Sequence, residues 1–250
     1  MTDSWTAHIE IRREYVHHHA DVVLDHHPGI RALLETSLVM AVPLTPVLRR
    51  NAGVESQGIG ATELNRAIKG NMQSARAWRF EAVVRDGVIL DNASNDAQVR
   101  GFDFAMYDVR HNLANLWSLC FGRRGVVQGD SVWQIYLASN PGQRRLATEI
   151  ESVGRAGEDL ESSREAPTIL GEVQFGNWAL AYRDMMKLLA ADAEIEVDLF
   201  VYVVADASLA RLISTGTVNF EGSVQILRDF RSVLKVPTVV VGLDVELTQG

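Results

Sequence analysis

The sequence has almost no cysteine and no long apolar run, and each shortage excludes a class of protein. Cys120 is the single cysteine in 250 residues, which excludes a disulfide framework and a zinc site built from several cysteines. The longest apolar runs fall far short of the roughly 18 residues that a membrane-spanning helix needs. Asp3, His8 and Glu10 stand where a signal peptide would be apolar. We therefore expect a cytoplasmic protein with no membrane partner.

Positive charge is also scarce. The chain has 24 Lys and Arg residues against 32 Asp and Glu residues, a formal net charge of -8. Duplex binding draws on Lys and Arg, so this balance argues against a general nucleic-acid binder. Among the basic residues, however, Arg outnumbers Lys by 21 to 3. Both a GC-rich genome and bidentate recognition of phosphate or guanine by Arg would produce this excess.

Apolar periodicity predicts an α/β protein with helices on a mixed sheet. The length suits one domain, residues 1–250, and no separate linker is visible. Helices are expected at 30–40, 62–78, 113–121, 178–191, 207–213 and 224–234, with a polar helix and loop at 141–161. Strands are expected at 102–107, 132–138, 168–175, 197–204 and 237–243, with a hairpin at 80–90. Loops are expected at 51–60 and 91–98.

One segment, residues 171–177 (GEVQFGN), stands out chemically. Glu172 and Gln174 are two residues apart on a predicted strand, so both side chains point to one face. A carboxylate on an otherwise apolar strand costs burial energy unless it is paired or bound to a metal. The spacing leaves two interpretations open: a metal-binding face, or a solvated face followed by a helix cap at Asn177.

The wider pattern resembles the BglII/BstYI-type type II restriction endonucleases, which are PD-(D/E)XK nucleases with Gln in place of the usual Lys. The resemblance rests on Glu172–Asn177 with Tyr182, Arg183 and Asp184, on the Ser/Gly-rich stretch Ser214–Glu221, and on Val236–Leu243. It implies a restriction-endonuclease-like core with a central mixed sheet flanked by helices. Residues 1–80 match faintly. Residues 105–165 match nothing in the family, and we expect them to form an insertion within the catalytic core.

For catalysis, the resemblance implies a Mg²⁺ ion held by an Asp, by Glu172 and by the backbone carbonyl of Val173. Hydrolysis of a phosphodiester uses such an ion to stabilise developing charge and to activate water. Carboxylate and carbonyl oxygens are the ligands that Mg²⁺ prefers. By the same resemblance Gln174 orients the attacking water. It is not a general base, because an amide has no titratable group near neutral pH.

The metal-binding Asp is the point where the sequence departs from the family, because Ser163 occupies its usual position. Asp103 and Asp159 are the two candidates. We prefer Asp103, which lies between two Phe residues on an apolar strand, because a metal ligand should be fixed on a packed element. This choice requires a long insertion before Glu172. Glu81 is either a further carboxylate near the metal or an ordinary surface residue.

DNA recognition is expected in two places. By resemblance, Asn177 lies where the family has a polar recognition residue, and Asn pairs bidentately with adenine. The second place is the polar loop Ser214–Glu221, whose candidate DNA-binding side chains are Ser214, Thr215, Thr217 and Asn219. The alternative interpretation of this segment is an ordinary polar turn. Arg pairs at 12–13, 49–50, 123–124 and 144–145 are either phosphate clamps or solvated surface.

The prediction is therefore a homodimeric, Mg²⁺-dependent type II restriction endonuclease that cuts both strands of a short palindromic double-stranded site. The resemblance implies a GATC core in that site and a separate cognate DNA methyltransferase in the same cell. Three alternatives remain open: a modification-sensing nuclease of the same fold, a DNA-binding protein whose metal site has decayed, and an α/β protein with no nucleic-acid function.

Overall fold

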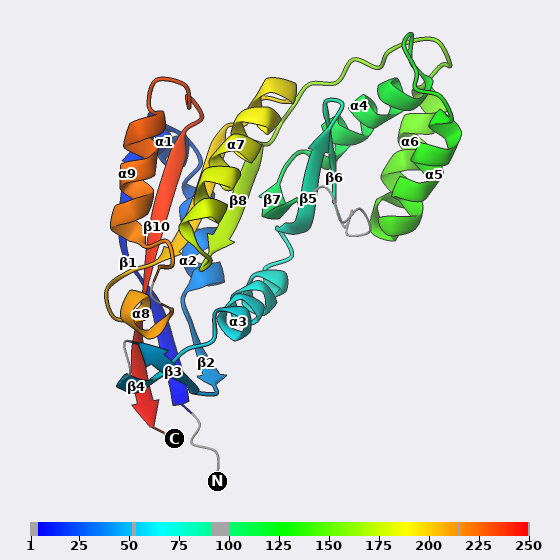
Figure 1. Cartoon of the computed structure of the whole chain (residues 1–250). Helices are drawn as coiled ribbons and strands as arrows, with labels where there is room; N and C mark the ends of the chain where they lie inside the picture. Colours follow the sequence, from blue (N-terminus) through cyan, green and yellow to red (C-terminus); the bar gives the residue numbers. More distant parts are fainter. Residues whose placement is uncertain (1–4, 52–53, 92–100, 215, 250) are drawn as a thin grey trace. The chain divides into compact units, whose positions relative to one another are not determined.

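The computed structural model describes residues 5–51, 54–91, 101–214 and 216–249, with the elements labelled in Figure 1. The chain forms two compact units. Unit 1 comprises Met1–Trp78, Gly171–Leu189 and Leu199–Gly250, and unit 2 comprises Arg79–Leu170 and Ala190–Asp198. The chain passes between the units inside strand β8 (Ile169–Gln174) and helix α7 (Trp178–Glu194). None of the described helices is long and apolar enough to cross a membrane.

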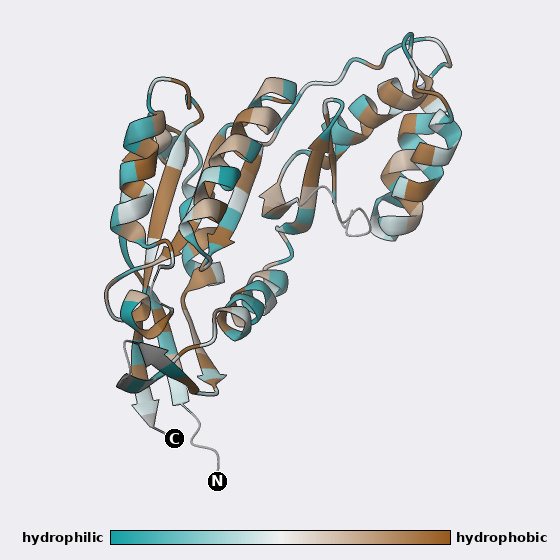
Figure 2. Cartoon of the chain, viewed as in Figure 1, coloured by the Kyte–Doolittle hydropathy of each residue, from teal (hydrophilic) through white to brown (hydrophobic). Residues whose placement is uncertain are grey.

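Unit 1 is built on a mixed sheet with the strand order β2-β1-β10-β9-β8. Strand β1 pairs antiparallel with β2 and with β10, whereas β10 and β9 are parallel. The apolar stretch of β10 is visible in Figure 2, and every residue of β9 is buried, as expected for a Val-rich strand covered on both faces. The other bounds are β1 Trp5–His17, β2 Met40–Leu44, β9 Leu199–Ala205 and β10 Thr238–Gln249, with a separate ribbon of β3 Val47–Asn51 and β4 Val54–Gly58.

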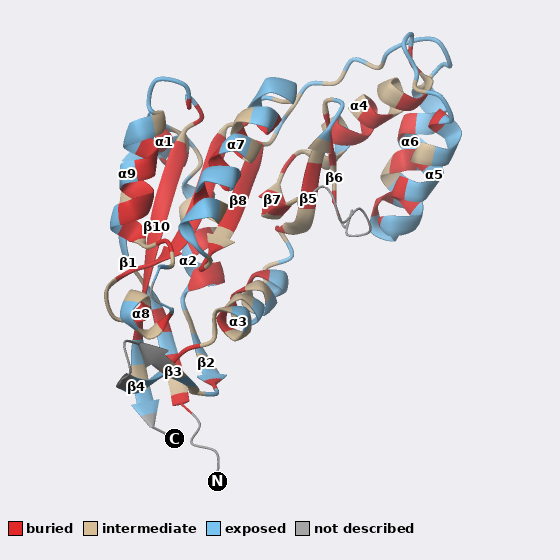
Figure 3. Cartoon of the chain, viewed as in Figure 1, coloured by how far each residue is buried: buried red, intermediate tan, exposed pale blue. Residues whose placement is uncertain are grey.

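Helices flank this sheet, and Figure 3 shows β8 and β10 buried while the outer surfaces of α7 and α9 are exposed. Helix α3 buries Leu64, Ile68 and Met72, the helical spacing that the sequence predicts. Helix α9 begins after Asn219, whose side chain caps it. The remaining helices of unit 1 are α1 Ala20–His26, α2 Pro28–Leu38, α3 Ala61–Ser74, α8 Ala207–Leu212 and α9 Phe220–Phe230.

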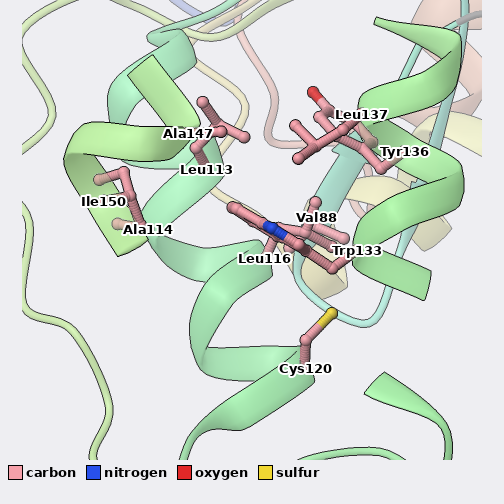
Figure 4. Close-up of a cluster of buried hydrophobic side chains, with 10 residues drawn as sticks. All are labelled: Val88, Leu113, Ala114, Leu116, Cys120, Trp133, Tyr136, Leu137, Ala147 and Ile150. Carbon is pink, nitrogen blue, oxygen red and sulfur yellow. The ribbon is translucent and has the colours of Figure 1, made fainter. Parts of the chain in front are cut away.

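Unit 2 combines a short sheet with the helices α4, α5 and α6 and a short 3-10 helix, Pro141–Gln143. Strands β5 and β6 form the predicted hairpin, and Asp86 and Gly87 at its turn have positive φ values of 53° and 78°, as a two-residue type I′ turn requires. Helices α4, α5 and α6 enclose the apolar cluster of Figure 4, in which Trp133 lies at the centre. The bounds are β5 Arg79–Arg85, β6 Val88–Leu90, β7 Phe102–Met106, α4 Val109–Phe121, α5 Gly129–Ser139 and α6 Arg144–Val153.

Three sequence predictions fail locally. Residues 132–138 were expected to be a strand but belong to α5, where Trp133, Tyr136 and Leu137 share a buried face at helical spacing. The expected loop at 51–60 contains strand β4. Strands β1 and β2 were not predicted, although Trp5, Ala7 and Ile9 alternate along β1 as buried residues. Of the loop expected at 91–98, residues 92–98 lie outside the described residues.

Candidate active site

Strand β8 presents Glu172 and Gln174 on one face, and both side chains are buried. Their relative exposures are 5% and 6%, and the intervening Val173 is half-buried. The prediction of a shared face is therefore confirmed, whereas the interpretation of that face as solvated is wrong. Buried polar side chains need partners, and helix α7 of the same unit supplies them.

Lys187 of α7 neutralises Glu172. Its ammonium Nζ donates a hydrogen bond to Glu172 Oε1, and the lysine side chain is only 17% exposed. One turn earlier on the helix, Asp184 is fully buried, and its Oδ1 lies 4.0 Å from the same ammonium. Removal of one charge from such a buried pair leaves the other uncompensated, so the three side chains form one electrostatic unit.

Gln174 is fixed at both ends of its amide. Its Nε2 donates to Asp184 Oδ2 at 2.6 Å, and its Oε1 accepts from the Gly176 N–H at 2.7 Å. A Cβ on Gly176 would lie 2.6 Å from Gln174 Oε1, so a larger residue there would push the amide oxygen away from this hydrogen bond. Burial, reinforced by the charges of Asp184 and Glu172, raises the pKa of Tyr202, whose hydroxyl donates to Asp184 at 3.5 Å.

Two of the predicted DNA-binding segments lie side by side. Asn177 and Thr217 form an isolated antiparallel bridge, and the Val218 N–H donates to the Gly176 carbonyl at 3.0 Å. The capping role of Asn177 is also observed, since its Oδ1 accepts from the Leu180 N–H at 3.3 Å.

The rest of the polar loop folds back on itself. The Thr217 hydroxyl donates to the Ser214 carbonyl at 2.8 Å. Asn219 caps α9 by accepting from the Gly222 N–H at 3.0 Å. Thr215 lies outside the described residues. The helix caps and the loop turn thus hold these polar groups at one edge of unit 1.

The two candidate metal-binding Asp residues both lie in unit 2, in different settings. Asp103 is half-buried on β7 between buried Phe102 and Phe104. In the β5–β7 register, Phe80 pairs with Phe104 and Ala82 with Phe102, so Glu81 and Asp103 fall at the same level; Glu81 has a positive φ of 51°. Asp159, in contrast, is exposed in a loop, where its Oδ1 accepts from the Arg123 N–H at 3.0 Å.

A family model described as "Restriction endonuclease BglII/BglIII" matches residues 13–243, almost the whole chain. The chain belongs to the BglII/BglIII restriction endonuclease family. It is therefore a type II site-specific deoxyribonuclease, of a family that uses divalent metal ions and binds double-stranded DNA. This outcome confirms the resemblance that starts at Glu172.

Two solved structures of BglII are similar to the chain. One is a crystal structure of restriction endonuclease BglII complexed with a DNA 16-mer, at 14% identity and a TM-score of 0.50, covering 94% of this chain and 75% of that chain. A crystal structure of free BglII has 14% identity and a TM-score of 0.42, covering 94% and 78%. The first confirms the predicted α/β restriction-endonuclease fold. No curated protein sequence matches the chain significantly.

The donor set fits the divalent metal that the BglII/BglIII family uses. The Glu172 carboxylate and the Val173 carbonyl are hard oxygen donors of the kind that Mg²⁺ prefers. The Glu172 carboxylate already pairs with one cation, the Lys187 ammonium. Within the described residues of the chain, no group of three or more His, Cys, Asp or Glu side chains gathers around a common point. Glu172 belongs to unit 1 and Asp103 to unit 2.

The Arg pair at 12–13 forms ion pairs within the protein, although both side chains are partly exposed. Arg12 Nη1 pairs with Asp244 at 3.0 Å, and Arg13 Nε pairs with Asp206 at 2.6 Å. Burial of Asp244 is outweighed by hydrogen bonds from the backbone N–H groups of residues 245, 209 and 208 and from Arg12, which lower its pKa. These arginines pair with the acidic residue that follows β9 and with one in the middle of β10.

Two site residues were missed as such by sequence reasoning, Asp184 and Lys187. Asp184 was noted only as part of the family pattern, and Lys187 was not noted. Helical spacing offers a partial signal, because the two residues are three apart and share the inner face of α7 with Met185 and Leu188. The contact with Glu172 depends on how α7 packs on β8, which spacing does not give.

Proposed function

We propose that this BglII/BglIII-family chain is a homodimeric, Mg²⁺-dependent endonuclease that cuts both strands of a short palindromic site. The observation that carries the proposal is the buried Glu172 beside Gln174 on β8, in a chain whose family model spans residues 13–243. A buried carboxylate next to a fixed amide fits cation binding and water orientation.

Glu172, the Val173 carbonyl and Asp103 are the proposed metal ligands. The ion, when bound, supplies charge stabilisation and water activation. Gln174 orients the attacking water, and its hydrogen bonds to Asp184 and the Gly176 N–H hold its amide in one orientation for that task. Pre-organisation of this kind places a reactant without further ordering at the moment of reaction.

Asp103 is favoured over Asp159 by its surroundings. It lies half-buried on a packed strand between buried Phe102 and Phe104, and a metal ligand should be fixed on such a packed element. Asp159 is exposed, and its carboxylate closes a loop through Arg123. Glu81, at about the same level on the neighbouring strand β5, is either a further carboxylate near the proposed metal or an ordinary strand residue.

Asn177 and the polar loop form the proposed base-reading edge. The bridge joins Asn177 to Thr217 of that loop, and the Thr217 hydroxyl donates to the Ser214 carbonyl. Asn219 and Thr215, the latter outside the described residues, complete the proposed set. Capping engages the amide oxygen of Asn177, so reading adenine through both amide atoms requires the oxygen to leave the Leu180 N–H or to share its second lone pair. A GATC core is what the resemblance to the family implies.

The homodimer is supported by an apolar stripe on α7. Trp178, Tyr182 and Met186 are exposed at successive turns of this helix. Exposed aromatic and Met side chains in a row favour protein contact, and a two-fold axis would match a palindromic site with one strand cut per subunit. A separate cognate methyltransferase is proposed as the protection that the host DNA needs.

The test is digestion of plasmid DNA with Mg²⁺, followed by sequencing of the ends. We expect discrete fragments with one palindromic sequence at every cut. Glu172→Ala and Asp103→Ala should abolish cutting while site binding in Ca²⁺ persists, and Asp159→Ala is the matched control that should still cut. An active Asp103→Ala variant with an inactive Asp159→Ala variant would reverse the assignment. Cleavage of methylated DNA alone would identify a modification-sensing enzyme instead.

A further inference from the structure

Lys187 is an unusual residue in this chain. Only three lysines stand among 24 basic residues, and Lys235 is exposed whereas Lys187 is largely buried against Glu172. Arg presents a wide planar fork, whereas Lys presents a compact ammonium on a flexible four-carbon stem. A contact to one carboxylate oxygen in a buried position suits the ammonium, so the side chain matches this place by size as well as by charge.

The surroundings of this ammonium contain two carboxylates. Glu172 Oε1 accepts its hydrogen bond, and Asp184 Oδ1 lies 4.0 Å away on the same helix. Tyr202 from β9 and Arg183 from α7 also face Asp184. Lys187 is therefore the buried cation that balances Glu172, and a small rotation of its stem would transfer the ammonium toward Asp184.

We propose that Lys187 is the counter-ion of Glu172 in the metal-free enzyme and competes with the divalent metal ion for that carboxylate. The inference rests on the proposed function, because it takes Glu172 as a metal ligand. Two cations on one carboxylate repel each other, strongly so where little water screens them. Metal binding therefore has to displace the ammonium, and Asp184 is the second anion that receives it. Lys187 keeps the empty site stable and sets a threshold for metal binding.

The experiment is a Mn²⁺ titration of the purified protein without DNA, followed by electron paramagnetic resonance of the free ion. Lys187→Met removes the competing charge and should tighten Mn²⁺ binding by at least about tenfold. Lys187→Arg keeps the charge and should bind within about twofold of the unaltered protein. Lys235→Met removes an exposed lysine of the same type and is the matched control. If Lys187→Met does not fold, Lys187→Gln answers the same question with a polar end.

A Glu172→Gln variant separates the two levels of the hypothesis. If it binds Mn²⁺ as the unaltered protein does, Glu172 is not a ligand and the proposed function fails. If it loses Mn²⁺ binding while Lys187→Met binds unchanged or more weakly, the metal role stands and the competition is refuted. Equal tightening in Lys187→Met and Lys187→Arg would also refute it, because charge would not be the cause.

Discussion

Neutralising Asp184 should destabilise the protein strongly. The variant Asp184→Asn keeps the shape of the side chain and removes its charge, so no cavity arises. The carboxylate is fully buried, accepts from Gln174 Nε2 at 2.6 Å and from Tyr202 Oη at 3.5 Å, and lies 4.0 Å from Lys187 Nζ. The loss is therefore electrostatic, and an Asn side chain also directs an amide N–H toward one of these donors.

The magnitude follows from these contacts. A hydrogen bond to a charged group contributes about 1.5–3 kcal/mol, and removal of one partner from a buried charge cluster costs about 3–5 kcal/mol. The two energies are not additive, because both include the cost of leaving a buried partner unpaired. Arg183 adds little, since its side chain is 42% exposed and its ion pair is screened by water. We expect Asp184→Asn to lower the free energy of unfolding by about 3 kcal/mol.

Urea unfolding at pH 7, followed by tryptophan fluorescence, measures this loss. Asp229→Asn is the matched control, because Asp229 is an exposed carboxylate that accepts one hydrogen bond from Gln225 at 2.8 Å. The control should change stability by less than about 0.5 kcal/mol. A loss for Asp184→Asn below about 1 kcal/mol would show that the buried charges are not coupled, and the reasoning would be wrong.

Burial lowers the pKa of His17, and this effect outweighs the hydrogen bond with the Leu234 carbonyl, which raises it. The unfolded chain therefore binds the proton first as the pH falls, and the free energy of unfolding should decrease below about pH 6.5. His17→Gln should make the urea midpoint less dependent on pH between pH 7.5 and 5.5, and an unchanged dependence would count against this reasoning. Burial raises the pKa of Cys120 to about 11, so a disulfide reagent at pH 8 should label it only in urea; rapid native labelling would contradict this. A Cβ on Gly222 would overlap the Trp178 ring. Gly222→Ala should therefore cost about 1 kcal/mol in thermal unfolding, whereas Gly70→Ala, with open space at its Cβ, should not.

Local chemistry allowed part of the fold to be predicted. The hairpin of β5 and β6 follows from Asp86-Gly87, because two residues with positive φ select the turn. The buried strand β9 follows from a continuous Val-rich run. The strand predicted at residues 132–138 is wrong because Trp133 and Tyr136 fit both a short apolar strand and a buried helix face. Only the packing of α5 decides between the two.

The candidate site was predictable where it lies within one element. The shared face of Glu172 and Gln174 follows from strand geometry alone. The partners Asp184 and Lys187 come from another element, so their contacts depend on the crossing of α7 over β8. The choice between Asp103 and Asp159 likewise depends on packing, because the sequence alone does not show that one Asp lies half-buried on a strand and the other in an exposed loop.

The pairing of β1 with β10 has a consequence for synthesis. Trp5 is opposite Gln249 and His17 opposite Thr238. Strand β1 therefore cannot form this pairing until β10 has been synthesised. Contacts so distant along the chain form late and slowly, and an unpaired strand edge invites aggregation meanwhile. During translation, the sheet that carries Glu172 therefore stays open between β1 and β9 until β10 has been synthesised.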